Sequence, residues 1–185
     1  IWKNMEGRCR TAIRKAEKSK VEVVRADTCQ WVEDYYRLVI DLYHRQGRVP
    51  PVGKDYYWYL AKEFQGKSVS ILLAKYEETT VAGAILGHYR ETVYYLDGAS
   101  SKSCHSLGVN NYIQWMALQW AAREGFRKYD FVGSDLPWLA KFKQSFGGEL
   151  TEYLLVEKAR SAAVRVLRER YSTLKVLTGR LRLTF

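Results

Sequence analysis

Cysteine, histidine, proline and methionine are all scarce in this chain. Its 185 residues include three cysteines, three histidines, three prolines and two methionines. Cys9, Cys29 and Cys104 are odd in number and widely scattered, and the histidines are equally dispersed. This spacing predicts neither a disulfide framework nor a zinc site, so no metal is expected. Unpaired thiols of this kind indicate a reducing, cytoplasmic setting.

Long hydrophobic runs are missing as well. No stretch approaches the roughly 20 apolar residues that a membrane span requires, and no signal-peptide pattern opens the chain. Hydrophobic residues make up 47% and charged residues 27% of the sequence, which is typical of a globular protein. A chain of this length can bury a real core, so we predict one domain over residues 1–185.

Acidic residues are too few to balance the basic ones. Thirty Lys and Arg residues against 20 Asp and Glu residues give a formal net charge of +10. Much of the excess lies in a basic lead-in segment, residues 1–25, and near the C-terminus, where it attracts RNA phosphates or anionic headgroups at the inner face of a membrane. A solvated helix face is the alternative. The candidate phosphate contacts are Arg14, Lys15, Lys18, Arg165 and Arg168.

Hydrophobic periodicity predicts an α+β fold. Helical spacing covers 4–20, 28–47, 54–65 and 110–124, with Thr28 as an N-cap and Gly125 as a stop. Strand patterns follow at 68–76, 81–90 and 92–100, and the short turns between them favour an antiparallel meander. Further strands are predicted at 21–26, 127–133 and 151–158, a short helix before Gly147, and a last helix at 159–174.

This order of elements resembles the GNAT N-acyltransferase fold, a mostly antiparallel sheet flanked by helices. Four stretches add a more specific resemblance to the FemABX-like aminoacyl and peptidyl transferases and to related BioF2-like GNAT acetyltransferase domains. They are "RTAIRKAEKSKVEV", "YYLDGASS", "YIQWMALQWAAREGFRKYDFVGS" and "FKQSFGG", in the same order as in that group. FemABX proteins typically contain two GNAT-like domains, so the resemblance implies that this chain is the second, with an N-terminal GNAT-like domain preceding it.

The resemblance implies transfer of an acyl or aminoacyl group to an amine, in the FemABX proteins from charged tRNA to a peptidoglycan precursor. It also gives a catalytic role to the lysine of the Phe-Lys pair, here Phe142 and Lys143. A cation within about 3 Å of the developing oxyanion lowers the barrier by a few kcal/mol. The alternative is a surface lysine with its stem on Phe142 and Phe146. Asp130 is a candidate general base, or else a cap for the next turn.

Other candidates lie at the end of the strand 92–100 and in the loop after it. Tyr95, Asp97 and Ser100 are candidate substrate contacts. In the loop, Lys102, Ser103 and Gly108 form a candidate phosphate cradle, because glycines and helix N-termini bind anions.

This loop departs from the Arg/Gln-x-x-Gly-x-Gly/Ala pattern of acetyl-CoA-binding GNAT proteins, which weakens the case for acetyl-CoA, and an ordinary surface loop is the alternative. The donor is therefore expected to be aminoacyl-tRNA or acyl-CoA, with no covalently bound cofactor. The alternatives are an acetyl-CoA-dependent N-acetyltransferase and a non-catalytic RNA- or membrane-binding module.

Overall fold

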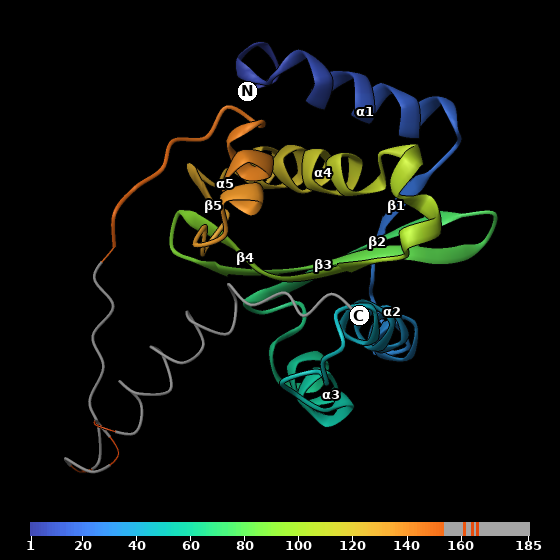
Figure 1. The fold of residues 1–185 in the computed structure, drawn as a ribbon, viewed down its shortest axis with the longest axis vertical. Coiled ribbons are helices and arrows are strands. Elements are labelled where there is room, and N and C mark those ends of the chain that lie inside the picture. The colour runs from blue at the N-terminus through green and yellow to red at the C-terminus, as the bar shows by residue number, and fades with distance from the viewer. Residues whose placement is uncertain (154–160, 162–163, 165, 167–185) are drawn as a thin grey trace, which may run out of the picture. The chain divides into compact units, whose positions relative to one another are not determined.

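The computed structural model describes residues 1–153, 161, 164 and 166 (Figure 1). The chain divides into two units, Ile1–Leu150 and Thr151–Phe185. The predicted strand at 151–158 and helix at 159–174 fall mostly outside the described residues, and so do Arg165 and Arg168. One domain over residues 1–185 therefore stays a prediction, and everything below concerns the first unit.

The first unit contains a sheet of five strands: β1 (Glu22–Arg25), β2 (Val69–Tyr76), β3 (Thr79–Tyr89), β4 (Thr92–Ser100) and β5 (Lys128–Asp130). The strands lie in sequence order, and every neighbouring pair is antiparallel except β4 and β5, which are parallel. The helices are α1 (Gly7–Lys18), α2 (Trp31–Arg45), α3 (Lys54–Phe64), α4 (Val109–Arg123) and α5 (Pro137–Gln144). Short 3-10 turns cover Trp2–Asn4 (η1) and Lys102–Leu107 (η2). The predicted α+β class with a mostly antiparallel sheet is confirmed.

Helices cover both faces of this sheet (Figure 1). On one face α4 packs on the strands and α1 lies over α4, whereas α2 and α3 cover the other face. Two buried clusters correspond to these layers, one around Ile113 and Val93, the other around Tyr35 and Ile71. The basic lead-in segment also has a packed inner side on α1, where the side chain of Ile13 is buried and the residue is 0% exposed. Burying such a side chain stabilises the fold by about 1.5–3 kcal/mol.

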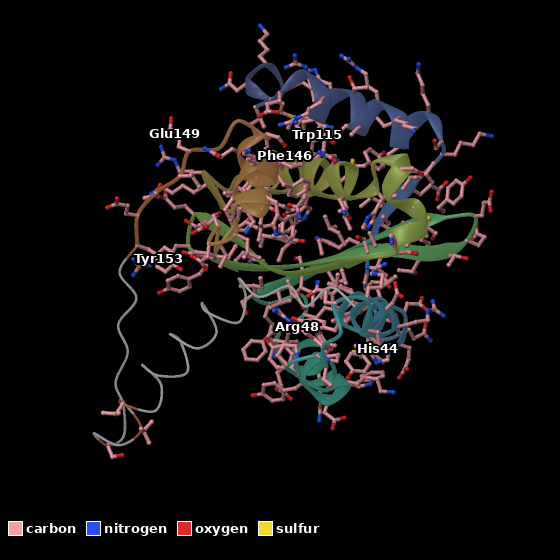
Figure 2. All side chains as sticks on the ribbon, in the orientation of Figure 1. His44, Arg48, Trp115, Phe146, Glu149 and Tyr153 are labelled. Atoms are coloured by element: carbon pink, nitrogen blue, oxygen red, sulfur yellow. The ribbon has the colours of Figure 1, made fainter. Side chains whose placement is uncertain are left out.

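A third cluster joins the start of the chain to α5. Trp2 contacts Trp115 of α4, with ring centroids 5.0 Å apart. The buried residues of this cluster are Met5, Cys9, Ile13, Leu118 and Phe146, and Figure 2 labels Trp115 and Phe146. The packing explains why α5, only eight residues long, keeps a fixed position beside α4.

Two predicted boundaries are wrong. The second helix begins at Trp31 with Gln30 as its N-cap, and not at the predicted cap Thr28, because residues 29–30 form a turn first. The last strand of the unit ends at Asp130, although 127–133 has a strand-like composition. Phe131, Val132 and Gly133 leave the sheet because another contact, described below, uses their carbonyl groups. The predicted stop at Gly125 is confirmed, since α4 ends at Arg123 and Gly125 has φ +83°.

Candidate active site

The last two strands pair over only three residues and then separate. Thr92, Val93 and Tyr94 pair with Lys128, Tyr129 and Asp130, and no pairing joins Tyr95–Ser100 to β5. Parallel strands that separate leave the facing edge of each strand without ladder partners. An extended ligand can pair with such an edge in the way that a peptide adds to a sheet. We call this opening between residues 95–100 and the segment after Asp130 the strand split.

A bulge in β4 shapes the side of the split that faces α3. Ile85 pairs with Asp97 and Leu86 pairs with Tyr95, so Leu96 is an extra residue. Side chains normally alternate between the two faces of a strand, but a bulge interrupts this alternation. Leu96 and Asp97 therefore both line one cavity of about 260 Å³ on the α2 and α3 side. The other residues of its lining are Tyr43, Pro51, Val52, Tyr56, Tyr57, Leu60 and Ile85.

Asp97 is the one charged residue among the described residues that line this cavity, which we call the Asp97 cavity. Its Oδ2 accepts a hydrogen bond from the Tyr57 hydroxyl at 2.8 Å, and its Oδ1 accepts one from the Gly98 amide at 2.8 Å. Burial and the nearby Asp97 carboxylate raise the pKa of Tyr57, and in the same way that of Tyr35. A carboxylate held among tyrosine rings attracts cations through its charge and through the ring faces. The cavity thus favours a ligand with a positive charge.

Tyr95 lies on the other face of β4. Its side chain packs in the core between the sheet and α4, and burial raises its pKa. A Cβ atom at Gly98 would overlap the Tyr95 ring, so the absence of a side chain at Gly98 makes room for that ring. Tyr95 and Asp97, both predicted substrate contacts, therefore lie on opposite faces of the part of β4 that does not pair with β5.

Ser100, the third predicted contact, is buried at the end of β4 and pairs with a residue that sequence analysis did not select. Its Oγ lies 3.0 Å from His105 Nε2, and its carbonyl accepts a hydrogen bond from Arg45 at 3.2 Å. Burial lowers the pKa of His105, and the charges of Arg45 and Lys102 lower it further. A neutral imidazole at this position can accept a proton. The spacing of five residues within a loop gave no signal that these two side chains would meet.

The three candidates for a phosphate cradle have different environments. Lys102 and Ser103 are exposed on η2, and Ser103 Oγ lies 2.8 Å from Ser101 Oγ. Gly108 is buried, has φ +81° and is the N-cap of α4. A Cβ atom there would overlap the Ala12 carbonyl oxygen and lie 2.9 Å from the carbonyl carbon. Gly108 therefore allows α1 to approach the start of α4, a packing role that the sequence did not suggest.

The predicted catalytic lysine lies beside the strand split, in α5. Its side chain is buried, with the residue only 7% exposed. The Nζ atom donates hydrogen bonds to the carbonyl oxygens of Phe131 at 2.7 Å, Val132 at 2.9 Å and Gly133. Burial lowers the pKa of Lys143, whereas the carboxylates of Asp130 and Asp135 act in the opposite direction. The surface-lysine alternative does not fit this environment, and the catalytic role stays a prediction.

Phe142 and Asp130 support the same region. The Phe142 ring packs edge-on against Phe146, with centroids 5.4 Å apart. Asp130 is exposed, and its Oδ1 accepts a hydrogen bond from the Val132 amide at 2.6 Å. This contact is the turn-capping alternative considered for Asp130. Its role as a general base, like the catalytic role of Phe142, stays a prediction.

Three basic side chains of α1 point away from the core. Arg14, Lys15 and Lys18 are exposed, and the Arg14 guanidinium lies 5.4 Å from the centroid of the Trp2 ring. These residues share the outer face of the helix whose inner face contains Cys9, Ile13 and Ala16. The arrangement gives the first unit a cationic surface, which we call the α1 basic face.

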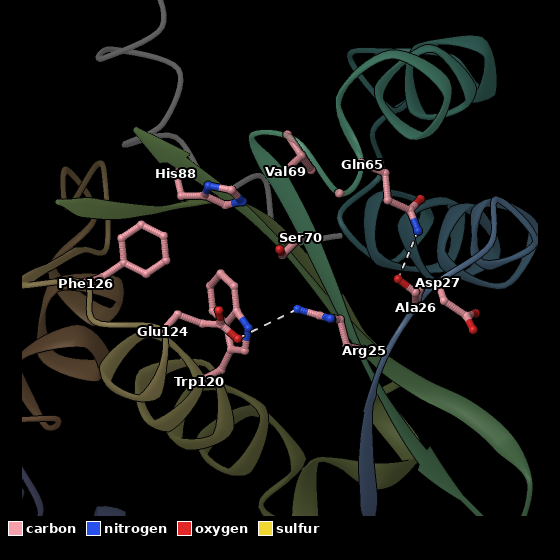
Figure 3. A pocket seen from close by; sticks show the side chains of 11 residues that line it. Arg25, Ala26, Asp27, Gln65, Val69, Ser70, His88, Trp120, Glu124 and Phe126 are labelled. Atoms are coloured by element: carbon pink, nitrogen blue, oxygen red, sulfur yellow. Dashed lines mark hydrogen bonds and ion pairs between the residues drawn. The ribbon is translucent and has the colours of Figure 1, made fainter. Parts of the chain in front are cut away.

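A second cavity, of about 400 Å³, lies between the end of β1, the start of β2, His88 of β3 and the C-terminal end of α4 (Figure 3). The indole N–H of Trp120 has no hydrogen-bond acceptor among the described residues. Arg25 and Glu124 form a loose ion pair of 3.9 Å across this cavity, and both side chains are half exposed. Nothing in its lining continues into the strand split, so it is separate from the candidate active site.

Neither a metal site nor a membrane span is found in the part of the chain that the structure describes. No three His, Cys, Asp or Glu residues among the described positions are grouped to bind a metal ion. No helix among them is long and apolar enough to cross a membrane.

A sheet that splits after a bulge in its fourth strand, covered by helices on both faces, defines the GNAT class of acyl-transferring enzymes. The sequence matches the family model of the acetyltransferase (GNAT) domain over residues 3–144, and the chain belongs to this family. The predicted enzyme class is thereby confirmed, and the non-catalytic alternative is not supported. No curated protein is significantly similar to the chain in sequence.

Solved structures confirm the fold and its resemblance to FemABX proteins. FemX has a TM-score of 0.67 at 18% identity, and the match covers 78% of this chain and 54% of FemX, so the chain spans about half of that protein. An aminoglycoside acetyltransferase from an uncultured soil metagenomic sample, in complex with sisomicin, has a TM-score of 0.58 at 17% identity, covering 78% and 97% of the two chains. AAC(6')-Iy, in complex with the bisubstrate analog CoA-S-monomethyl-acetylneamine, has a TM-score of 0.60 at 16% identity, and the match covers 76% of this chain and 99% of AAC(6')-Iy.

Proposed function

We propose that this domain transfers an aminoacyl group from charged tRNA to a primary amine, with the peptidoglycan precursors of FemABX proteins as the model acceptor. The observation that carries the proposal is the packing of α1 on Gly108. In acetyl-CoA-binding GNAT proteins the corresponding helix start binds the pyrophosphate of the cofactor. Here a basic helix covers that position and presents Arg14, Lys15 and Lys18 to solvent. A polyanion much larger than coenzyme A fits such a surface better.

The Asp97 cavity supplies the acceptor side of this proposal. An amine is protonated in water, so it enters as an ammonium group and meets the Asp97 carboxylate between tyrosine rings. The carboxylate then takes one proton, and the neutral amine attacks the carbonyl carbon of the donor held in the strand split. As the tetrahedral intermediate collapses, the ester C–O bond breaks and the 3′-oxygen of the tRNA leaves as a hydroxyl group with the proton that Asp97 took. The nitrogen releases its second proton to water, which completes the amide and restores the Asp97 carboxylate. The resulting oxyanion needs an N–H donor, and the extra residue Leu96 has an amide outside the pairing register with β3.

Acyl transfer from acyl-CoA to an amine is the second candidate. It is supported by the likeness to AAC(6')-Iy, whose structure contains a coenzyme A derivative. It is supported also by Lys102 and Ser103, which are exposed next to the end of β4. Calorimetry with acetyl-CoA separates the two candidates, because tight binding requires a phosphate site at residues 102–110. Binding of acetyl-CoA with micromolar affinity would favour the second candidate over the first.

The test of the transfer step is an assay with aminoacyl-tRNA or acetyl-CoA as donor and an alkylamine as acceptor, with the amide product detected by mass spectrometry. We expect Asp97→Asn to lower turnover by about 10²–10⁴-fold, the usual contribution of a general base. Asp55→Asn is the matched control, because Asp55 is an exposed carboxylate in the first turn of α3. Equal turnover in the two variants would remove Asp97 from the mechanism.

A further inference from the structure

The ammonium group of Lys143 occupies a cage made of three successive carbonyl oxygens. An ammonium group has three N–H donors, and here Phe131, Val132 and Gly133 accept all three. The side chain reaches this cage from α5 and is almost fully buried. No proton of the ammonium group is left to stabilise an oxyanion while the cage is intact.

The backbone of the cage is in an unusual conformation. Val132 has φ +55°, and a β-branched residue in this left-handed region is a clear outlier. Such a conformation persists only where surrounding contacts impose it, and it is frequent at functional sites. Two contacts impose it here: the Lys143 ammonium holds the carbonyl side, and the Asp130 carboxylate holds the Val132 amide.

The cage also has a defined place in the fold. It begins one residue after the final β4–β5 pair, Tyr94 with Asp130, so it forms the β5 wall of the strand split. Phe131 holds the first residue of the cage in place, because the Phe131 ring packs against the rings of Tyr129 and Phe146, with centroid distances of 5.0 Å and 5.5 Å. A regular strand through 131–133 would have its carbonyl and amide groups free to extend the ladder along β4. Pulling these carbonyls toward α5 keeps the split open.

We propose that Lys143 is a positioning residue, whose ammonium group holds residues 131–133 away from β4 and so keeps the donor site open. This inference rests on the proposed function for its link to the donor, but the cage itself does not. Burial favours loss of the Lys143 charge, and the carboxylates of Asp130 and Asp135 keep the ammonium form that the cage requires. Arginine cannot replace it, because a planar guanidinium does not direct three donors to one converging set of oxygens.

The first experiment truncates the lysine and refills the cage. Lys143→Ala leaves three carbonyl oxygens facing a space that a small primary ammonium ion fits. We expect methylammonium or n-butylammonium to raise the melting temperature of Lys143→Ala and to restore hydrogen-exchange protection of residues 131–135. Tetramethylammonium has the same charge but no N–H donor, so it restores neither. Lys141→Ala is the matched control, because Lys141 is exposed on the same helix. We expect none of the three cations to change the melting temperature of Lys141→Ala.

The second experiment measures kinetics with the donor. A positioning role predicts that Lys143→Ala raises KM for the donor at least tenfold, with a smaller effect on kcat, and that methylammonium reverses this change. A large loss of kcat with unchanged KM and unchanged protection of 131–135 would overturn the proposal in favour of direct catalysis. The exchange and melting measurements need no donor. If the unaltered protein transfers nothing, the proposed function fails while the cage is still tested.

A third measurement uses the unaltered chain, in case Lys143→Ala does not fold. The three hydrogen bonds predict that the Lys143 ammonium protons exchange slowly with water and give a resolved ¹H–¹⁵N correlation. The protons of the exposed Lys141 exchange too fast to be seen under the same conditions. If Lys143 exchanges as fast as Lys141, the cage does not exist in solution and the proposal is overturned.

Discussion

Replacement of Gly108 by alanine tests the assignment of this glycine to helix packing. Its backbone has φ +81°, which costs an alanine about 1–2 kcal/mol. The new Cβ atom would also overlap the Ala12 carbonyl group, which belongs to the backbone of α1 and cannot rotate away. Overpacking of this kind costs about 1–3 kcal/mol. The two costs together predict that Gly108→Ala lowers the free energy of unfolding by about 2–5 kcal/mol.

Gly125→Ala is a closely matched control. Gly125 has φ +83° and follows the other end of the same helix, but no atom lies within 4 Å of the position its Cβ would take. This variant therefore has the cost of the backbone conformation alone, about 1–2 kcal/mol. Urea unfolding followed by tryptophan fluorescence measures both variants, and the difference between them gives the contribution of the contact with α1.

Equal losses of stability in the two variants would refute the packing role. A phosphate cradle predicts a different pattern, in which Gly108→Ala and Gly125→Ala are equally stable but only Gly108→Ala binds acetyl-CoA more weakly. The pair of variants thus tests the observation on which the preference for a tRNA donor depends.

Two further predictions concern charge. Burial lowers the pKa of His88 and His105 below the ordinary value of 6.5, so the unfolded chain binds more protons than the folded one at mildly acidic pH. The stability that these neutral histidines contribute is present above pH 6.5 and is lost as the pH falls through their folded-state pKa values. The double variant His88→Gln with His105→Gln is expected to flatten this part of a plot of unfolding free energy against pH. An unchanged slope would contradict the assignment. On the α1 basic face, Lys15→Ser with Lys18→Ser is expected to reduce the slope of log K for tRNA against log salt by about 0.7–0.9 for each lost phosphate contact. A control of equal charge comes from α3 and the turn after it, Lys62→Ser with Lys67→Ser, and an equal effect there would show that only net charge matters.

Local sequence patterns predicted the helices and strands of the first unit well, because hydrophobic periodicity is a property of neighbouring residues. They failed where a distant residue decides the backbone. Phe131, Val132 and Gly133 have the composition of a strand, yet Lys143 draws their carbonyl groups out of the sheet. The helix start at Trp31 was missed because Thr28 is a good capping residue that the preceding turn does not use.

The candidate site shows the same limit. The sequence predicted Lys143 in a short helix and Asp97 toward the end of a strand, as the structure shows. It gave no sign of the bulge at Leu96, since an extra residue in a strand is defined only by its partner strand. The pairing of Ser100 with His105 likewise depends on how η2 folds back on β4.

The extra residue Leu96 has a consequence for the history of this chain. Loss of Leu96 would remove the bulge and restore the regular alternation of side chains through Tyr95 and Asp97. Asp97 would still pair with Ile85, so its carboxylate would stay on the α3 side of the sheet. Related chains that differ by one residue at this point of β4 are therefore expected to differ in the bulge, and not in the side of the sheet that displays the carboxylate.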